Sequence, residues 1–279
     1  MFEENKTVSQ ISDGSVIHDR YKVGKALRTS LRSRTYLGWD QQLEQSVVLK
    51  ELCPQGISWN DTQWDTERSR FLQEAQQLQQ LPDRTVIPRL LDQFTEKETE
   101  YLVLEYIPGT TLQQWVQEKE PMSVKLAMQW LMPLLISLGP LHDKALFHGS
   151  ICPDNILLTD DGSVTLLEWG VNRYMGDGES IRPVLEDGYA AMEQYLTKGK
   201  TGTWTDVYSL CACFQFSVTG KRPASVVDRV LMDPEFQWDG PELTPDIWNA
   251  MKNGLQLSQK NRTSTATKLL HTFATFIVF

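Results

Sequence analysis

The first hundred residues of the chain change between strand-like and helix-like patterns of apolar positions. Three β-rich runs separated by polar turns lie within residues 21–52 and predict three strands. Over residues 62–81 the apolar positions recur every three or four residues, which is the period of an amphipathic helix. Residues 88–91 and 101–106 are two further apolar runs that continue the predicted sheet. The pattern predicts a β-rich domain that carries one helix.

The rest of the chain is dominated by helical periods. Residues 123–138 predict a helix with Ser123 as its N-cap, and Pro133 inside it costs roughly 3 kcal/mol unless the helix kinks. Two short alternating runs, residues 155–158 and 164–167, are joined by an Asp-Asp-Gly turn and predict a small hairpin. Polar residues gather around this hairpin, which indicates a binding or catalytic site, with a solvated loop as the alternative.

The composition is typical of a soluble globular protein, because 41% of the 279 residues are hydrophobic and 23% are charged. The net charge of −9 argues against binding to phosphate backbones. The basic cluster of Arg28, Arg32 and Arg34 is too short to change this conclusion. We therefore expect no nucleic-acid partner.

The cysteines and the chain ends bear on the cellular compartment. Four cysteines form no Cys-x-x-Cys pair and no zinc-site spacing, so a reducing, cytoplasmic location is expected. The N-terminus is polar and acidic, unlike a signal peptide, and no apolar run reaches the roughly 18 residues of a membrane span. The apolar end at Phe279 leaves two alternatives, the last turn of a core helix or a cut before a further segment.

The motif with the most chemical content is HGSICPDN at residues 148–155, followed by EWG at residues 168–170. These segments resemble the H-R-D-x-K-P-x-N and D-F-G loops of eukaryotic-type protein kinases, and the chain is similar to a bacterial Ser/Thr member of that superfamily. Further matches follow the order of the family, namely VVLK ending at Lys50, YLVLEYIPG at residues 101–109 and AME at residues 191–193.

The resemblance covers about residues 20–275 and implies an α+β fold of the bilobal, protein-kinase-like type. A small β-rich N-lobe is expected over residues 18–107 and a larger α-helical C-lobe over residues 108–279. Residues 1–17 show no periodicity and are expected to form a flexible N-terminal arm.

The resemblance also implies roles for individual residues. In the family, a strand lysine pairs with a helix carboxylate, hinge backbone groups contact adenine, and two loop residues hold Mg²⁺. The matching nucleotide-binding positions are Lys50, Glu74, Glu105, Ile107, Asn155 and Glu168, and the last two would form a weak metal site. Structural positions match His148, Trp169, Glu193, Asp206 and Arg262, with Arg262 expected to pair with Glu193 and Asp206 expected to hold the loop backbone.

Several chemically active positions of the family carry other residues here. The catalytic base is replaced by Ser150, the following lysine by Cys152 and the arginine of H-R-D by Gly149. Arg28, Ser30 and Ser33 stand at the three positions of the glycine-rich loop. Because Ser150 cannot act as a general base near neutral pH, a contribution of roughly 100- to 10,000-fold is expected to be lost.

These substitutions predict a pseudokinase, a kinase-like scaffold or regulatory protein that lacks efficient phosphotransfer and acts through a protein partner. An active kinase or another signalling protein is the expected kind of partner, and binding of ATP and Mg²⁺ is expected to be weak or absent. The alternative is an unconventional ATP-dependent transferase or a weakly active Ser/Thr protein kinase that uses the residual site of Lys50, Glu74, Asn155 and Glu168.

Overall fold

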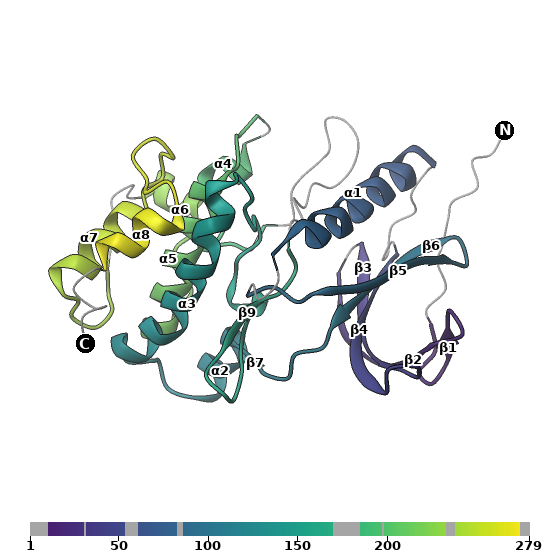
Figure 1. Cartoon of the computed structure of the whole chain (residues 1–279). Helices are drawn as coiled ribbons and strands as arrows, with labels where there is room; N and C mark the ends of the chain where they lie inside the picture. Colours follow the sequence, from purple (N-terminus) through teal and green to yellow (C-terminus); the bar gives the residue numbers. More distant parts are fainter. Residues whose placement is uncertain are drawn as a thin grey trace. The chain divides into compact units, whose positions relative to one another are not determined.

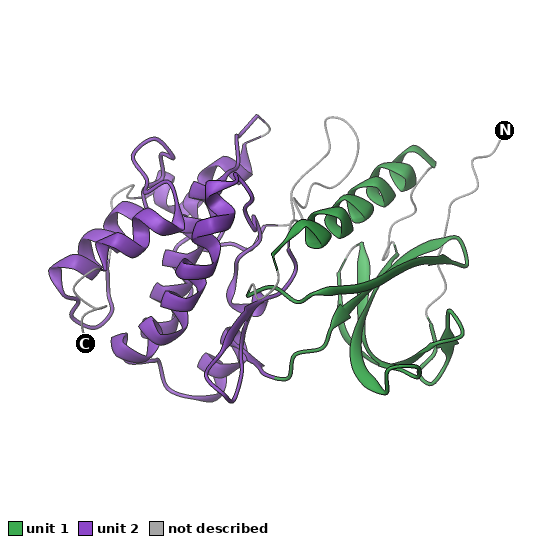
Figure 2. Ribbon diagram, in the orientation of Figure 1, with its two compact units in different colours: residues 1–108 green, residues 109–279 purple. Residues whose placement is uncertain are grey.

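The computed structural model describes residues 11–30, 32–53, 61–82, 86–169, 185–196, 198–232 and 238–273. The chain divides into two compact units, Met1–Pro108 and Gly109–Phe279 (Figure 2). The boundary lies one residue beyond Ile107, where the predicted N-lobe ends. The first unit combines a sheet with one long helix and the second is mainly helical, so the chain has the expected α+β content.

The first unit is built on a six-stranded antiparallel sheet with the strand order β1-β2-β3-β4-β6-β5 (Figure 1). Its helix, α1, spans Asp61–Gln80 and lies within one residue of the predicted bounds at each end. The strands are β1 (Val16–Ile17), β2 (Tyr21–Thr29), β3 (Ser33–Asp40), β4 (Gln45–Leu52), β5 (Leu90–Glu96) and β6 (Thr99–Glu105).

The alternation of side chains along β4 gives this sheet two different apolar faces. Val47 and Leu49 belong to a core on one face, whereas Leu52 belongs to a second core that includes Phe71 of α1. Successive side chains of a strand point to opposite faces. Lys50 therefore shares the face of Leu52, which is the face covered by α1.

The prediction of a flexible arm over residues 1–17 is wrong at its C-terminal end. Residues 1–10 lie outside the described part of the chain. Val16–Ile17 form strand β1, in which Ile17 pairs with Tyr21, and the Ile17 side chain is buried in the sheet core. A two-residue strand is too short to show a period, so burial of one apolar side chain was not visible in the pattern.

The predicted strand at residues 88–91 is also corrected. The structure places β5 at Leu90–Glu96, where it forms the last strand of the sheet and pairs only with β6 among the described strands. Within β5, Phe94 is buried whereas its neighbours Gln93 and Thr95 are exposed. Polar residues on a strand with one unpaired edge resemble a loop in the sequence, which explains the wrong bounds.

A buried carboxylate lies inside the sheet core of the first unit. Glu51 is fully buried, and its two carboxylate oxygens accept hydrogen bonds from the hydroxyl groups of Tyr36 at 2.9 Å and Tyr101 at 3.0 Å. Burial raises the pKa of Glu51 above its ordinary value, and the two tyrosine hydroxyls oppose this shift only in part. Burial likewise raises the pKa of Tyr36, to about 12.

We expect Glu51→Gln to change how stability depends on pH. Because the pKa of Glu51 is higher in the folded than in the unfolded protein, the folded state holds more protons, so this group lowers stability as pH rises above 4.5. Gln cannot ionise and removes this dependence. Urea unfolding should show that the variant gains stability relative to the wild type between pH 4 and pH 7. A stability difference that is constant across this range would contradict the prediction.

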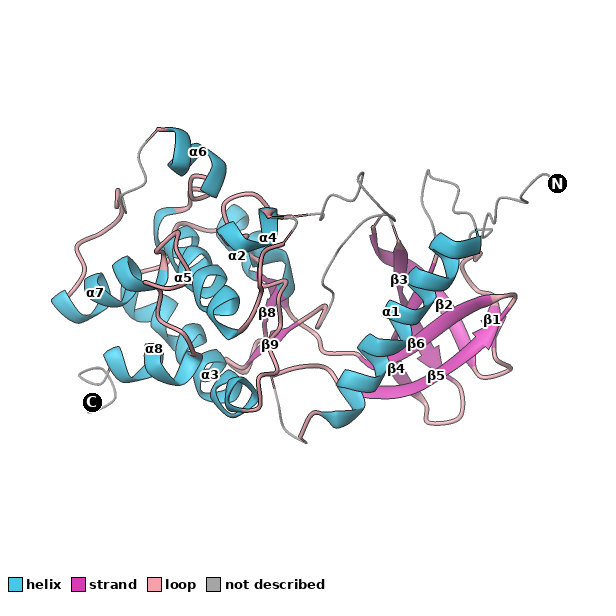
Figure 3. Ribbon diagram, turned by 90° about the horizontal axis from the view of Figure 1, so that it is seen from above, coloured by secondary structure: helices cyan, strands magenta, loops and turns pink. Residues whose placement is uncertain are grey.

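The second unit is organised around α5 (Thr203–Thr219), in which 14 of the 17 residues are buried. α5 packs against α3, α7 and α8 (Figure 3). The other helices are α2 (Leu112–Glu118), α3 (Val124–Asp143), the 3-10 helix η1 (Pro153–Asn155), α4 (Met192–Tyr195), α6 (Val226–Leu231), α7 (Pro245–Gly254) and α8 (Ala266–Thr272).

A small three-stranded sheet with the order β7-β8-β9 completes the second unit. Its strands are β7 (Thr110–Thr111), β8 (Ile156–Leu158) and β9 (Val164–Leu166). The hairpin predicted from the alternating runs is confirmed as the antiparallel pair β8–β9, in which Leu157 lies opposite Thr165. This hairpin fixes the ends of the HGSICPDN and EWG segments on either side of it.

Helix α3 begins as predicted and ends later than predicted. The Ser123 side chain caps its N-terminus by accepting a hydrogen bond from Leu126 N. The helix continues through Gly139 and Pro140 to Asp143, although the sequence suggested an end at Leu138. A side chain at position 139 would place its Cβ 2.7 Å from Oγ1 of Thr267 in α8. Gly139 therefore allows close packing of α3 against α8 and does not end the helix.

Among the described helices, only α3 is long and apolar enough to cross a membrane by length and composition. The sequence pattern had not suggested such a segment. Ten of its 20 residues are buried, and it packs against α5 and α8. The core helix of a globular domain meets the same criterion, so this finding is weak evidence for a membrane span.

Candidate functional site

The predicted nucleotide-binding residues are divided between the two units. Lys50, Glu74, Glu105 and Ile107 lie in the first unit, and Asn155 and Glu168 lie in the second. We describe the two groups separately, beginning with the lysine on the sheet.

Lys50 of β4 and Glu74 of α1 form the predicted ion pair. Lys50 Nζ lies 2.7 Å from Glu74 Oε1, and the two side chains are 4% and 6% exposed. The Lys50 ammonium also lies 5.9 Å from the centre of the Phe71 ring, one helical turn before Glu74. Removing one partner of such a buried pair leaves an uncompensated charge, so the contact ties α1 firmly to the sheet.

The tip of the β2–β3 hairpin occupies the position of the family's glycine-rich loop. Ser30 N donates to Ser33 O at 2.9 Å, and the Ser30 hydroxyl oxygen accepts from Ser33 N at 3.0 Å and from Arg32 N at 3.3 Å. Three backbone amides at this tip are therefore bonded within the tip itself. An amide that already donates to its own loop is not directed at a phosphate oxygen.

Glu105 and Ile107 lie at the C-terminal end of strand β6 and just beyond it. Glu105 ends β6, its amide donates to Arg89 O at 2.9 Å, and its carboxylate pairs with the Arg89 side chain at 3.1 Å. These contacts fix the end of β6 to the start of β5. The adenine contacts expected from the backbone of Glu105 and Ile107 stay a prediction.

In the second unit, Asp206 of α5 holds the backbone at the start of the HGSICPDN segment. Its carboxylate accepts hydrogen bonds from His148 N and Gly149 N, both at 2.7 Å. It also lies 3.1 Å from His142 Nε2. Because His142 Nδ1 accepts a hydrogen bond from Ala266 N, the ring proton lies on Nε2 and is donated to Asp206. The fully buried carboxylate thus has three donors.

His148 links this segment to Leu167, the residue that follows strand β9 of the hairpin. Its Nε2 lies 2.9 Å from Leu167 O, and its Nδ1 accepts a hydrogen bond from Ser150 N at 3.2 Å. The His148 ring also packs edge-on against the Trp169 ring, with centroids 5.6 Å apart. His148 and Trp169 therefore have the structural surroundings that the resemblance implies for them.

Ser150 and Cys152 stand where the family has charged groups. The buried Asn155 donates from Nδ2 to Ser150 O at 2.7 Å, and its Nδ2 lies 3.5 Å from the Ser150 hydroxyl. Cys152 is buried, at 2% exposure. The Asn155 side chain thus bonds to the loop backbone, and the loop carries a neutral hydroxyl and a buried thiol at these two positions.

The EWG segment contains two features that are unfavourable for the free energy of the folded chain. Glu168 has a φ of +63°, in the left-handed region that side-chain-bearing residues rarely adopt. The buried Trp169 Nε1 has no hydrogen-bond partner among the described residues. A buried, unsatisfied donor costs about 1–3 kcal/mol. Packing of the indole against His148 therefore decides its position, not hydrogen bonding.

A magnesium site would rest on Asn155 and Glu168. Within the described ranges no group of three or more His, Cys, Asp or Glu residues is arranged to hold a metal ion. One amide and one carboxylate are oxygen donors of the kind that Mg²⁺ takes, but phosphate oxygens and water must then supply the other ligands. The donor chemistry fits a weak site that depends on a nucleotide.

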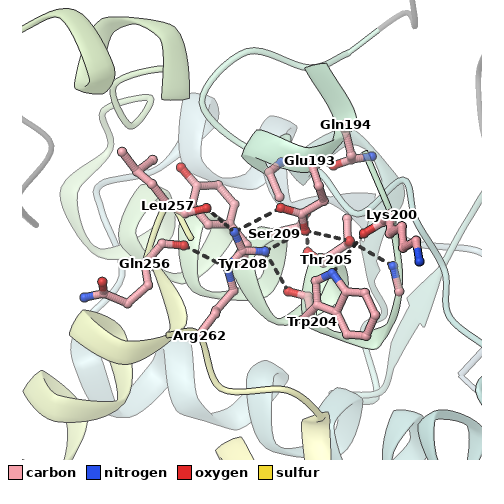
Figure 4. Close-up of polar contacts among 12 residues, drawn as sticks. Glu193, Gln194, Lys200, Trp204, Thr205, Tyr208, Ser209, Gln256, Leu257 and Arg262 are labelled. Atoms are coloured by element: carbon pink, nitrogen blue, oxygen red, sulfur yellow. Dashed lines mark hydrogen bonds and ion pairs between the residues drawn. The ribbon is translucent and has the colours of Figure 1, made fainter. Parts of the chain in front are cut away.

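Glu193 of α4 and Arg262 form a bidentate buried pair at the predicted positions (Figure 4). Arg262 NH1 lies 2.7 Å from Glu193 Oε1, and NH2 lies 3.1 Å from Oε2. The same guanidinium donates to three backbone carbonyls and lies over the Tyr208 ring, and Thr205 donates to Glu193 Oε1. This network joins α4, α5 and the segment before α8.

The sequence did not single out several partners in these networks. His142 lies 64 residues from Asp206, and in α5 Thr205 bonds to Glu193 while the Tyr208 ring lies against Arg262. His142 is one of four histidines in the chain and lies in the last turn of the apolar helix α3. Its burial could have been predicted from this position. Thr205 and Tyr208 gave no such signal.

Comparisons with known proteins identify the family of this chain. The sequence model of the family described as the protein kinase domain matches residues 23–274. Serine/threonine-protein kinase C of Synechocystis is 29% identical over 270 residues, which cover 92% of this chain and 50% of the relative. Serine/threonine-protein kinase PknL of Mycobacterium tuberculosis is 29% identical over 213 residues, 76% of this chain and 52% of the relative.

A further relative, serine/threonine-protein kinase D of Synechocystis, is 31% identical over 217 residues, which cover 74% of this chain and 42% of the relative. The chain thus spans about half the length of the curated relatives that it matches. With the kinase-type loops, the β-rich first unit and the helical second unit, these matches assign the bilobal kinase fold. The chain belongs to the protein kinase superfamily, as a bacterial-type member.

Proposed function

We propose that this chain is a pseudokinase, a kinase-like regulatory protein that binds a protein partner and does not transfer phosphate efficiently. The observation that carries the proposal is the chemistry at Ser150. The surrounding loop is held by Asp206 and His148, yet the side chain at the base position is a neutral hydroxyl. A serine hydroxyl cannot take a proton from an acceptor hydroxyl near neutral pH.

Two further features support the proposal. The buried thiol of Cys152 offers no positive charge to a phosphate, where the family has a lysine. The amides of Ser30, Arg32 and Ser33 are satisfied within the hairpin tip, so the backbone cradle that usually approaches the phosphates is already occupied. Weak or absent binding of ATP and Mg²⁺ follows from the second feature.

The partner is expected to be an active kinase or another signalling protein, since the matched relatives are described as serine/threonine-protein kinases. A reducing, cytoplasmic location is part of the proposal, because the four cysteines, all of them buried, have neither a Cys-x-x-Cys pair nor a zinc-site spacing. The buried Lys50–Glu74 pair stabilises the first unit, and the Glu193–Arg262 network stabilises the second.

The test is transfer of labelled γ-phosphate to the protein itself and to general acceptor proteins. We expect no transfer that depends on Lys50, so the wild type and Lys50→Met should give the same background. The double variant Ser150→Asp, Cys152→Lys restores the base and the charge, and it tests whether these two positions limit transfer, because a general base is worth roughly 100- to 10,000-fold only where ATP is bound. Wild-type transfer that Lys50→Met abolishes would overturn the proposal.

A further inference from the structure

Two buried carboxylates lie on the same face of helix α1. Glu67 and Glu74 are seven residues apart, or two helical turns, and are 6% and 5% exposed. Glu74 pairs with Lys50 of β4. Glu67 makes a second set of contacts, which the roles implied by the family resemblance do not include.

Glu67 joins α1 to the tip of the β2–β3 hairpin. Arg32 NH1 lies 2.7 Å from Glu67 Oε2, and Arg70 of α1 binds the other oxygen, Oε1. The Arg32 and Glu67 side chains are only 12% and 7% exposed. An exposed ion pair contributes little to stability, but breaking a pair at this depth leaves a charge without compensation.

The residue that carries the guanidinium is itself fixed to the sheet. The Arg32 carbonyl accepts a hydrogen bond from Cys53 N at 2.8 Å, just after β4, and Arg32 N bonds to the Ser30 hydroxyl. A displacement of the hairpin tip would therefore move Arg32 relative to Glu67. The hairpin, the end of β4 and α1 are mechanically connected through this residue.

We propose that Arg32 and Glu67 form a latch that fixes α1 on the sheet and thereby keeps Glu74 within reach of Lys50. The latch also removes Arg32 from the side chains that could contact a phosphate. The latch does not depend on whether the chain transfers phosphate, so the two proposals are tested independently.

The experiment measures hydrogen exchange of the full chain by mass spectrometry, together with the rate at which Lys50 is acylated. Glu67→Gln keeps the side-chain size, Arg32→Gln leaves a shorter polar side chain, and each substitution removes one charge. Both should increase exchange of the α1 amides by about 10-fold and increase the acylation rate of Lys50. The double variant should exchange no faster than the more affected single variant, because both changes break the same contact.

Three controls make the result decisive. Arg89→Gln breaks an exposed guanidinium–carboxylate pair that does not involve α1, and it should leave α1 exchange unchanged. Arg32→Lys keeps the charge and should retain most of the protection. The amides of the central strand β6 in the first unit report whether each variant is folded. Any one of three outcomes would overturn the latch. These are unchanged α1 exchange in both Gln variants, additive effects in the double variant, and an effect of Arg89→Gln on α1 as large as that of the Gln variants.

Discussion

Replacing Arg262 by alanine is expected to lower the free energy of unfolding of the second unit by about 3–5 kcal/mol. The Arg262 side chain is 0% exposed and its partner Glu193 is 4% exposed, so the substitution leaves a buried carboxylate without its main counter-charge. It also deprives three backbone carbonyls of their donor, at Trp204, Gln256 and Leu257. Urea unfolding followed by circular dichroism measures the change.

Two further variants test whether the loss of stability comes from the buried contacts of Arg262. Lys260→Ala removes an exposed positive charge close to Arg262 in the sequence, and its effect should stay within about 0.5 kcal/mol. Arg262→Lys keeps the charge but cannot bind Glu193 in a bidentate manner or reach all three carbonyls, so an intermediate loss is expected. A loss below 1 kcal/mol for Arg262→Ala would show that the network contributes little to stability.

The second large effect is expected for Asp206→Asn, which should cost about 2–3 kcal/mol and loosen the loop at His148 and Gly149. The asparagine oxygen can accept from one of the two amides. Its NH₂ group must then face a second donor, either a loop amide or His142 Nε2, and two donors cannot bond to each other. The native carboxylate accepts a hydrogen bond from all three donors.

Hydrogen exchange of the loop amides and urea unfolding measure these two consequences of Asp206→Asn. Asp154→Asn is the matched control, because Asp154 lies in the same loop and is exposed. Its effect on both measurements should be small. If Asp206→Asn leaves loop exchange at the wild-type rate, the carboxylate is not what holds this backbone.

Much of the fold could be predicted because its elements have clear periods. The three- and four-residue spacing of α1 and the two-residue alternation of the β8–β9 hairpin come directly from burial of one face. The errors at β1 and β5 have one cause in common, which is that each strand was too short or too polar to show its period, whereas the end of α3 was misplaced because Gly139 and Pro140 lie inside the helix. β1 has two residues, and β5 is a polar strand at the edge of the sheet.

The site was predictable only where a motif identified both partners. Lys50 with Glu74 and Glu193 with Arg262 were paired from a resemblance, and the structure places each pair in contact. Arg32 and Glu67 are 35 residues apart and have no motif, so in the sequence they look like solvated charges. The orphan N–H of Trp169 could not be anticipated either, because it results from how the indole packs against His148.

Gly139 shows how one absent methyl group limits the variation that this fold can accept. The helices α3 and α8 meet at Thr267 with no room for even an alanine. A descendant that gains a side chain at position 139 must either spread the two helices or shorten residue 267 at the same time. Changes at these two positions should therefore be inherited together, and a laboratory selection that varies only one of them should return glycine.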